Sequence, residues 1–110
     1  MRRMILCAAL LLALLTGLAW GYTTFLKDPD ATLDYTVDWS DWLDPNDTIS
    51  ASAWSVPSGL TQVSASYTTT SATIWLSGGT AGSRYAVVNR ISTAAGRTED
   101  RSFVVVCQER

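Results

Sequence analysis

Hydrophobic and polar residues alternate along most of the chain beyond residue 22, and this alternation predicts β-strands. The clearest example is an apolar set of one parity: Leu33, Tyr35, Val37 and Trp39. Asp34, Thr36 and Asp38 lie between them, so a period of two gives the strand one buried and one wet face. The same pattern predicts five further strands, within residues 49–56, 60–67, 72–76, 84–92 and 101–107.

The apolar residues of each later strand share a parity, which defines one face of the strand. A parity switch between Ala53 and Trp54 predicts a β-bulge in the second strand. The third strand should place Val63, Ala65 and Tyr67 together on one face. The last three strands have these inward sets: Ala72, Ile74 and Leu76; Tyr85, Val87, Asn89 and Ile91; Phe103, Val105 and Cys107.

Short strands, frequent turns and no helical periodicity after residue 22 predict an all-β sandwich or barrel. Pro45 and Asn46 form one turn, and glycines lie in the loop of residues 78–82. Tyr85 follows that loop two residues before Val87, like the tyrosine corner of immunoglobulin-like sandwiches. We therefore expect an immunoglobulin-like β-sandwich of about six to seven strands, without the disulfide of antibody domains.

The first twenty-one residues form a separate hydrophobic segment, which leaves residues 22–110 for the sandwich. Arg2 and Arg3 precede an apolar run from Met4 to Leu15, the layout of a secretory signal peptide or a short helical anchor. Met4–Trp20 is at the short end for a spanning helix. A third interpretation is a mis-called start codon, with the mature protein beginning near Thr23.

Composition restricts the chemistry. Residues 22–110 contain ten acidic and six basic residues, a net charge of −4, which gives no electrostatic footprint for nucleic acid. The chain has no histidine, which excludes a serine–histidine triad and a Cys/His zinc site. Cys107 lies in an apolar strand and is expected to be a small buried hydrophobe. We expect no enzyme activity and no cofactor.

Two further motifs have a chemical interpretation that we do not favour. Seven aspartates lie between Asp28 and Asp47, but their spacing does not match an EF-hand loop. Solvated strand faces and turn caps explain them better, and short loops leave little room for a glycosidase cleft. The glycine loop of residues 78–82 lacks the Lys-Ser/Thr ending of a phosphate-binding loop, so we expect a plain turn.

Tryptophans and arginines are the candidate contacts for a protein partner. Parity places Trp39 in the core, and exposed tryptophans commonly anchor interfaces. Acids dominate residues 28–47 and arginines dominate the last third. If these regions lie at opposite ends, the alternatives are head-to-tail docking of copies and a basic face that meets an acidic partner. The candidate interface residues are Trp42, Trp54, Trp75, Arg84, Arg97 and Arg101.

Three stretches resemble a family of small tailed-phage and prophage virion proteins, the fiber-tail adaptors. They are residues 25–43, 73–82 and 91–101. The first contains K-D-P-D followed by L-D-Y-x-x-D-W-S-x-W-L, and the second contains W-L-S-G-G-T-A-G. The resemblance covers roughly residues 23–110, and relatives typically begin just before K-D-P-D.

The resemblance implies a structural component of a phage tail or baseplate that joins tail proteins to fibers, with no active site. The implied partners are other tail and fiber proteins, with copies of the chain itself as a further candidate. The implied location is the virion, assembled in the host cytoplasm, and a membrane is involved only if residues 1–21 are retained. The alternative is a secreted or membrane-tethered immunoglobulin-like module that binds protein or carbohydrate.

Overall fold

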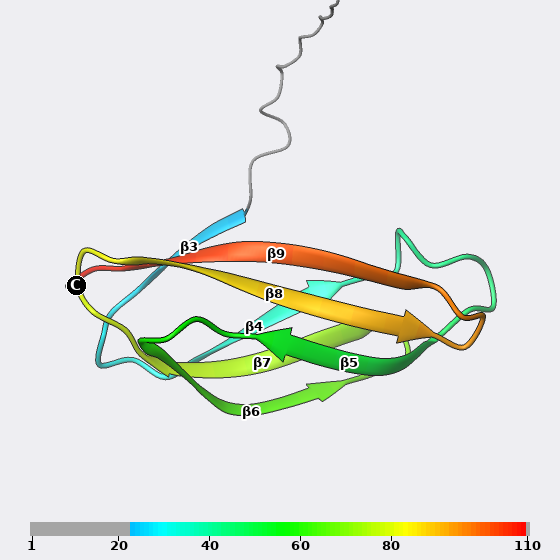
Figure 1. The fold of residues 1–110 in the computed structure, drawn as a ribbon, viewed down its shortest axis with the longest axis horizontal. Helices are drawn as coiled ribbons and strands as arrows, with labels where there is room; N and C mark the ends of the chain where they lie inside the picture. The colour runs from blue at the N-terminus through cyan, green and yellow to red at the C-terminus, as the bar shows by residue number, and fades with distance from the viewer. Residues whose placement is uncertain (1–22, 110) are drawn as a thin grey trace, which may run out of the picture.

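The structure is a computed structural model that describes residues 23–109, which form seven strands in two sheets (Figure 1). One sheet has the order β3 (Thr23–Lys27), β9 (Thr98–Cys107), β8 (Arg84–Thr93) and β5 (Ile49–Ser55). The other has the order β4 (Leu33–Asp38), β7 (Ser71–Gly78) and β6 (Leu60–Tyr67). All neighbours are antiparallel except β3 and β9, which are parallel.

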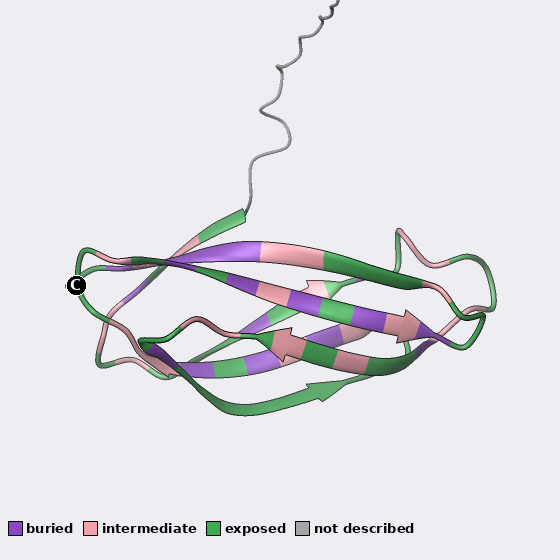
Figure 2. Ribbon diagram, in the orientation of Figure 1, coloured by how far each residue is buried: buried purple, intermediate pink, exposed green. Residues whose placement is uncertain are grey.

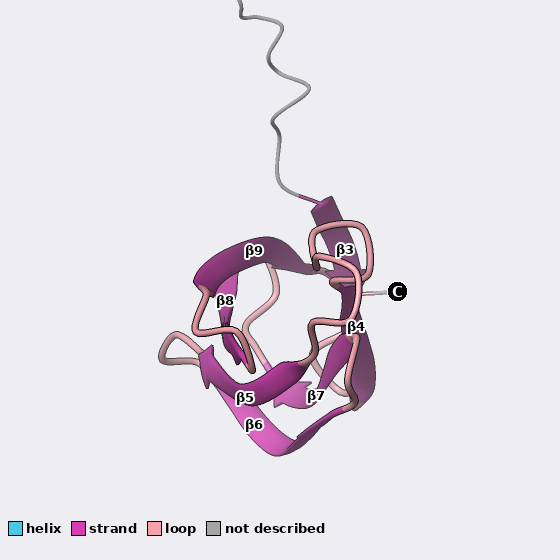
Figure 3. Cartoon of the chain, turned by 90° about the vertical axis from the view of Figure 1, so that its right-hand side faces the viewer, coloured by secondary structure: helices cyan, strands magenta, loops and turns pink. Residues whose placement is uncertain are grey.

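The two sheets enclose a common interior when the molecule is viewed end-on (Figure 3). Sequentially adjacent strands repeatedly change sheet, as in immunoglobulin-like sandwiches. The predicted immunoglobulin-like fold is therefore confirmed. The predicted hydrophobic segment of residues 1–21 lies outside the described residues. Within residues 23–109, no helix is long and apolar enough to cross a membrane.

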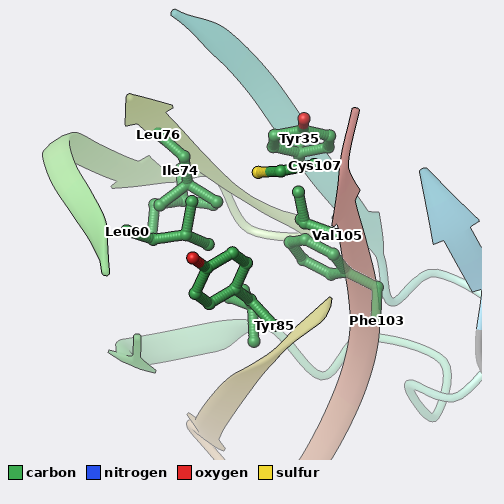
Figure 4. Close-up of a cluster of buried hydrophobic side chains, with 9 residues drawn as sticks. Tyr35, Leu60, Ile74, Leu76, Tyr85, Phe103, Val105 and Cys107 are labelled. Carbon is green, nitrogen blue, oxygen red and sulfur yellow. The ribbon is translucent and has the colours of Figure 1, made fainter. Parts of the chain in front are cut away.

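The core follows the predicted parity on four of the strands, except that Leu33 at the start of β4 is exposed. Buried and exposed residues alternate along β7 and β8, as Figure 2 shows by colour. The larger cluster of buried side chains gathers between the sheets (Figure 4). Its aromatic members contact one another, with ring centroids 5.3 Å apart for Tyr35 and Phe103 and 5.5 Å apart for Phe25 and Phe103. Such pairs add specific geometry to the burial of apolar area.

Strand β6 departs from the prediction that Val63, Ala65 and Tyr67 share one face. Only Leu60 is buried, whereas Val63, Ala65 and Tyr67 are exposed. The pairing register with β7 shifts between Gln62 and Ser64, so Val63 lies at an irregularity. The cause is position: β6 is an edge strand, and the opposite sheet meets its inner side only in part, through a 2.9 Å hydrogen bond that the Tyr67 hydroxyl donates to the Ser50 carbonyl of β5. A hollow of about 250 Å³ lies there instead, lined partly by Ala65 and Tyr67.

Two other predicted details are corrected. The irregularity in β5 lies between Ile49 and Ala51, not at the predicted switch near Trp54. Strand β3 was not predicted, because Thr23–Lys27 contains only Phe25 as a large apolar residue of inward parity. The other inward residue is Lys27, whose side chain is fully buried. Its ammonium donates hydrogen bonds to the carbonyl oxygens of Gly78 (2.6 Å) and Asp28 (3.0 Å).

The loop between β7 and β8 is packed against the end of β9. The Thr80 amide donates a 2.9 Å hydrogen bond to the Tyr85 hydroxyl oxygen, which supports the predicted tyrosine corner. Gly79 has a φ of 100°, and a Cβ built on it would lie 2.2 Å from the Cys107 sulfur. Gly82 has a φ of 90°, but no atom lies within 4 Å of its Cβ position. Gly79 is therefore required for space as well as for backbone conformation.

We expect Gly79→Ala to lower the free energy of unfolding by about 1–3 kcal/mol more than Gly82→Ala. Both substitutions place a Cβ at positive φ, so both incur backbone strain. Only the first also forces a methyl group into the packed Cys107 sulfur, and overpacking of this kind costs about 1–3 kcal/mol. Urea unfolding of both variants measures the difference, and equal losses would contradict the packing argument.

Candidate functional site

The aspartates of residues 28–47 serve mainly to organise their own loops. The Asp38 carboxylate accepts a 2.9 Å hydrogen bond from the Ser40 amide, which lowers the pKa of Asp38. Asp28 accepts a 2.8 Å bond from the Asp30 amide. Among residues 23–109, no three His, Cys, Asp or Glu side chains are grouped as metal ligands. The carboxylates thus have a structural use as turn caps.

Asp47 joins the β4–β5 loop to the β8–β9 hairpin. Its Oδ1 atom accepts hydrogen bonds from the amides of Thr48 (2.9 Å) and Ala95 (3.1 Å). Desolvation pushes the pKa of Asp47 upward, but hydrogen bonds from Thr93, Ala95 and Thr48 and the charge of Arg97 outweigh it. The net result is a lowered pKa, which means that the folded state favours the carboxylate.

Two arginines lie over two tryptophans at this same end of the sandwich. The Arg97 guanidinium lies 4.2 Å from the Trp42 ring centroid and pairs with the Asp44 carboxylate at 3.2 Å. Arg101 lies 4.4 Å from the Trp39 ring centroid. Its guanidinium also donates a 2.8 Å hydrogen bond to the Asp38 carbonyl, which ties β9 to the end of β4. Cation–π contacts of this kind fix both partners.

Trp39 is the centre of that end. Its ring is fully buried and contacts Trp42 edge-on at 5.5 Å between centroids. The Trp39 indole N–H donates a 2.9 Å hydrogen bond to the Oδ1 atom of Asn89 on β8. The Asn89 amide in turn donates to the Ser52 hydroxyl (2.9 Å) and the Ala53 carbonyl (3.1 Å) of β5. One buried amide therefore connects the end of β4 with β8 and β5.

These contacts settle the charge arrangement. We call the β4–β5 connection, residues 39–48, the acidic loop. Arg97 and Arg101 lie beside it, so the condition for head-to-tail docking of an acidic and a basic end is not met. Arg90 forms an exposed ion pair with Asp100 at 2.7 Å. Arg84 is exposed and forms no ion pair within the described part of the chain.

A different surface is free of charge altogether. No charged residue occurs between Asp47 and Arg84, a stretch that comprises β5, β6, β7 and their connections. We call the side of the sandwich that exposes β5, β6 and β7 the uncharged side. Its large exposed hydrophobic side chains are Trp75 (42% exposed), Tyr67 (46%) and Val63 (55%). Depletion of charge together with exposed aromatic residues is typical of the centre of a protein interface.

Trp75 lies on the outer face of the three-stranded sheet. It pairs with Asp34 on β4 and with Ser64 on β6. Next to it, the hydroxyl groups of Thr36 and Thr73 are 2.8 Å apart and share a hydrogen bond. The large indole ring therefore stands among small polar side chains, where a partner can reach it.

Trp54 lies on the edge strand β5 and lines the hollow between β5 and the edge strand β6. It is half-buried, contacts Phe103 at 6.1 Å between centroids and lines hollows of about 360 and 250 Å³ on either side of β5. Its indole N–H is buried and has no hydrogen-bond acceptor among the described residues. Trp42 is also half-buried, beneath Arg97. The structure thus brings Trp42, Arg97 and Arg101 together and leaves Trp54, Trp75 and Arg84 elsewhere.

Comparison with known proteins identifies a family that the chain matches. Residues 27–106 match a family model described as the podophage GP4 fiber-tail adaptor protein gp77. The chain belongs to this family. The matched range includes the strands β4 to β8 in full, with the acidic loop and the uncharged side. Membership makes the chain a virion component with a structural, tail-adaptor role and with other tail or fiber proteins as its partners.

The adaptor also resembles a solved domain, the PKD domain from the KIAA 1837 protein. The two are 17% identical, the match covers 81% of each chain, and the TM-score is 0.48. The fold assignment above rests on the strand order of this chain and not on that likeness. No curated protein matches the adaptor.

Sequence reasoning did not include Val63 and Tyr67 among the candidate interface residues of the adaptor. A signal was nevertheless present. The absence of charge from Thr48 to Ser83 marks the region in the sequence alone, since edge strands are normally protected by charged residues.

We expect Asn89→Ala to lower the free energy of unfolding by about 1–3 kcal/mol, because the Trp39 indole N–H would be left buried and unpaired. A double-mutant cycle with Trp39→Phe should show a coupling energy of at least about 0.5 kcal/mol. Urea unfolding measures both quantities. Strictly additive losses would show that the hydrogen bond contributes nothing.

Acid should destabilise the fold partly through Asp47. Its folded-state pKa is lowered, so its contribution is present above the ordinary Asp pKa and is lost as pH falls through the folded-state value. We expect Asp47→Asn to destabilise at neutral pH and to reduce the fall in urea midpoint between about pH 6 and about pH 2. Asp41→Asn removes the same charge from the same loop and should keep the wild-type fall. Parallel curves for all three proteins would contradict this role.

Proposed function

We propose that the chain is a non-enzymatic structural component of a phage tail or baseplate, and that it joins tail proteins to fibers through protein–protein contacts. The family match over residues 27–106 is the observation that supports this function. The absence of histidine from the chain is consistent with a role in binding. We place the adaptor function in residues 22–110 and its assembly in the host cytoplasm.

We further propose that Trp75 contacts a tail or fiber partner. A large exposed indole surrounded by Asp34, Ser64 and hydroxyl groups fits the anchor residue of an interface, where a few aromatic side chains supply most of the affinity. Arg84, exposed and unpaired in residues 23–109, is the candidate for a contact at the rim. Trp42, Arg97 and Arg101 remain candidates, but each already packs within the acidic loop.

The role can be tested on purified phage particles. Mass spectrometry and N-terminal sequencing should find the protein in the particles, with a start near Thr23 if the first segment is not part of the mature adaptor. Particles made without the gene should lack fibers. A protein that starts near Tyr22 in a periplasmic or culture fraction, and that is absent from particles, would refute the proposal and favour the secreted binding module.

The Trp75 contact has a sharper test. Loss of an anchor residue weakens binding by about 2 kcal/mol or more, roughly 30-fold, so Trp75→Ala should reduce incorporation into particles by at least tenfold. Leu26→Ala is the control, since Leu26 is equally exposed but lies on β3 of the other sheet. Unfolding midpoints verify that both variants are folded. Equal incorporation of the two variants would show that Trp75 makes no such contact.

A further inference from the structure

The four edge strands of the sandwich differ in how they are protected. Strand β4 carries Asp34 and Asp38, and β3 is short and ends in the buried Lys27. Strands β5 and β6 contain neither a charged residue nor a proline, the residues that normally prevent an edge from pairing with another chain. The two unprotected edges lie on the same side of the molecule, with the hollow lined by Trp54, Ala65 and Tyr67 between them.

The charge of the rest of the chain restricts what can meet this side. Residues 22–110 have a net charge of −4, so two copies repel each other over most of their surfaces. The uncharged side is where two copies can approach without bringing like charges together and without desolvating a charge. A second copy presents the same uncharged surface, so contact between the two surfaces brings no like charges together.

Symmetry allows an edge strand to pair with its own copy, and greater exposure favours β6 over β5. A two-fold axis perpendicular to the sheet brings two copies of one edge strand together antiparallel, which is the geometry of an isologous dimer. From Thr61 to Tyr67 every residue of β6 is exposed, so neither face of the strand is covered. Figure 2 shows this strand as a continuous exposed ribbon at the margin of the molecule.

We propose that a second copy of the chain pairs with this one through the β6 edge. The two three-stranded sheets then form one six-stranded sheet, and the second copy covers the hollow between β5 and β6. The outer faces of both sheets lie on the same side of the pair, so two Trp75 side chains share one surface. This pairing rests on the fold and its charge distribution, and it is independent of the proposed virion role.

The test compares two lysine substitutions in the full chain by sedimentation equilibrium. Ala65→Lys places an inward-pointing charge in the β6 edge, a device by which natural edge strands avoid pairing. Ala86→Lys adds the same charge at an equally exposed alanine in the middle of the other sheet. We expect the wild type and Ala86→Lys to dimerise alike, and Ala65→Lys to raise the dimer dissociation constant at least tenfold. If Ala65→Lys fails to fold, Ser64→Lys on the same edge replaces it.

Several outcomes would overturn the pairing. A monomeric wild type would do so, as would association that neither substitution weakens, that both weaken equally, or that only Ala86→Lys weakens. A monomer whose binding to a tail or fiber protein is reduced by Ala65→Lys would assign the edge to that partner instead. Failure of the dimer leaves the particle experiment unaffected, because incorporation into virions is measured separately.

Discussion

The hydrogen bond between the Trp39 indole and the Asn89 side chain is the interaction on which one whole end of the sandwich depends. Asn89 is held by Ser52 and Ala53 of β5, so the indole has one position that satisfies its N–H. A buried donor without a partner is costly, and this fixes the ring. The Trp42 edge and the Arg101 guanidinium then pack on the fixed ring, and the contact with Trp42 positions the acidic loop.

That arrangement explains why the obvious charges of the chain are poor candidates for recognition. Arg97 and Arg101 are already engaged with tryptophans, with Asp44 and with the Asp38 carbonyl. A partner would have to break these contacts before it could use the guanidinium groups. Recognition by an adaptor of this shape is therefore better served by a surface without ion pairs and cation–π contacts to break, and the uncharged side meets that condition.

The sequence predicted the sandwich and the inward faces of β4, β7, β8 and β9, because each of these strands is buried on one face only or lies centrally. It failed where burial does not follow parity. Ala65 and Tyr67 have the inward parity, but they lie on an edge strand and stay exposed, although the Tyr67 hydroxyl bonds to the Ser50 carbonyl of β5. The pairing of Arg97 with Asp44 joins residues far apart in the chain, so no local pattern could indicate it. Strand β3 was missed because its second inward residue is a lysine.

That lysine has a practical consequence for the study of particles. Lys27 is the chain's sole lysine, and its ammonium is enclosed between two backbone carbonyls. Acylating dyes and amine-directed cross-linkers need an accessible amine, and the folded adaptor offers no lysine at its surface. Position in a particle would have to be mapped through carboxylate or arginine chemistry. This adaptor can thus be abundant in a particle and still give no signal in a lysine-based map.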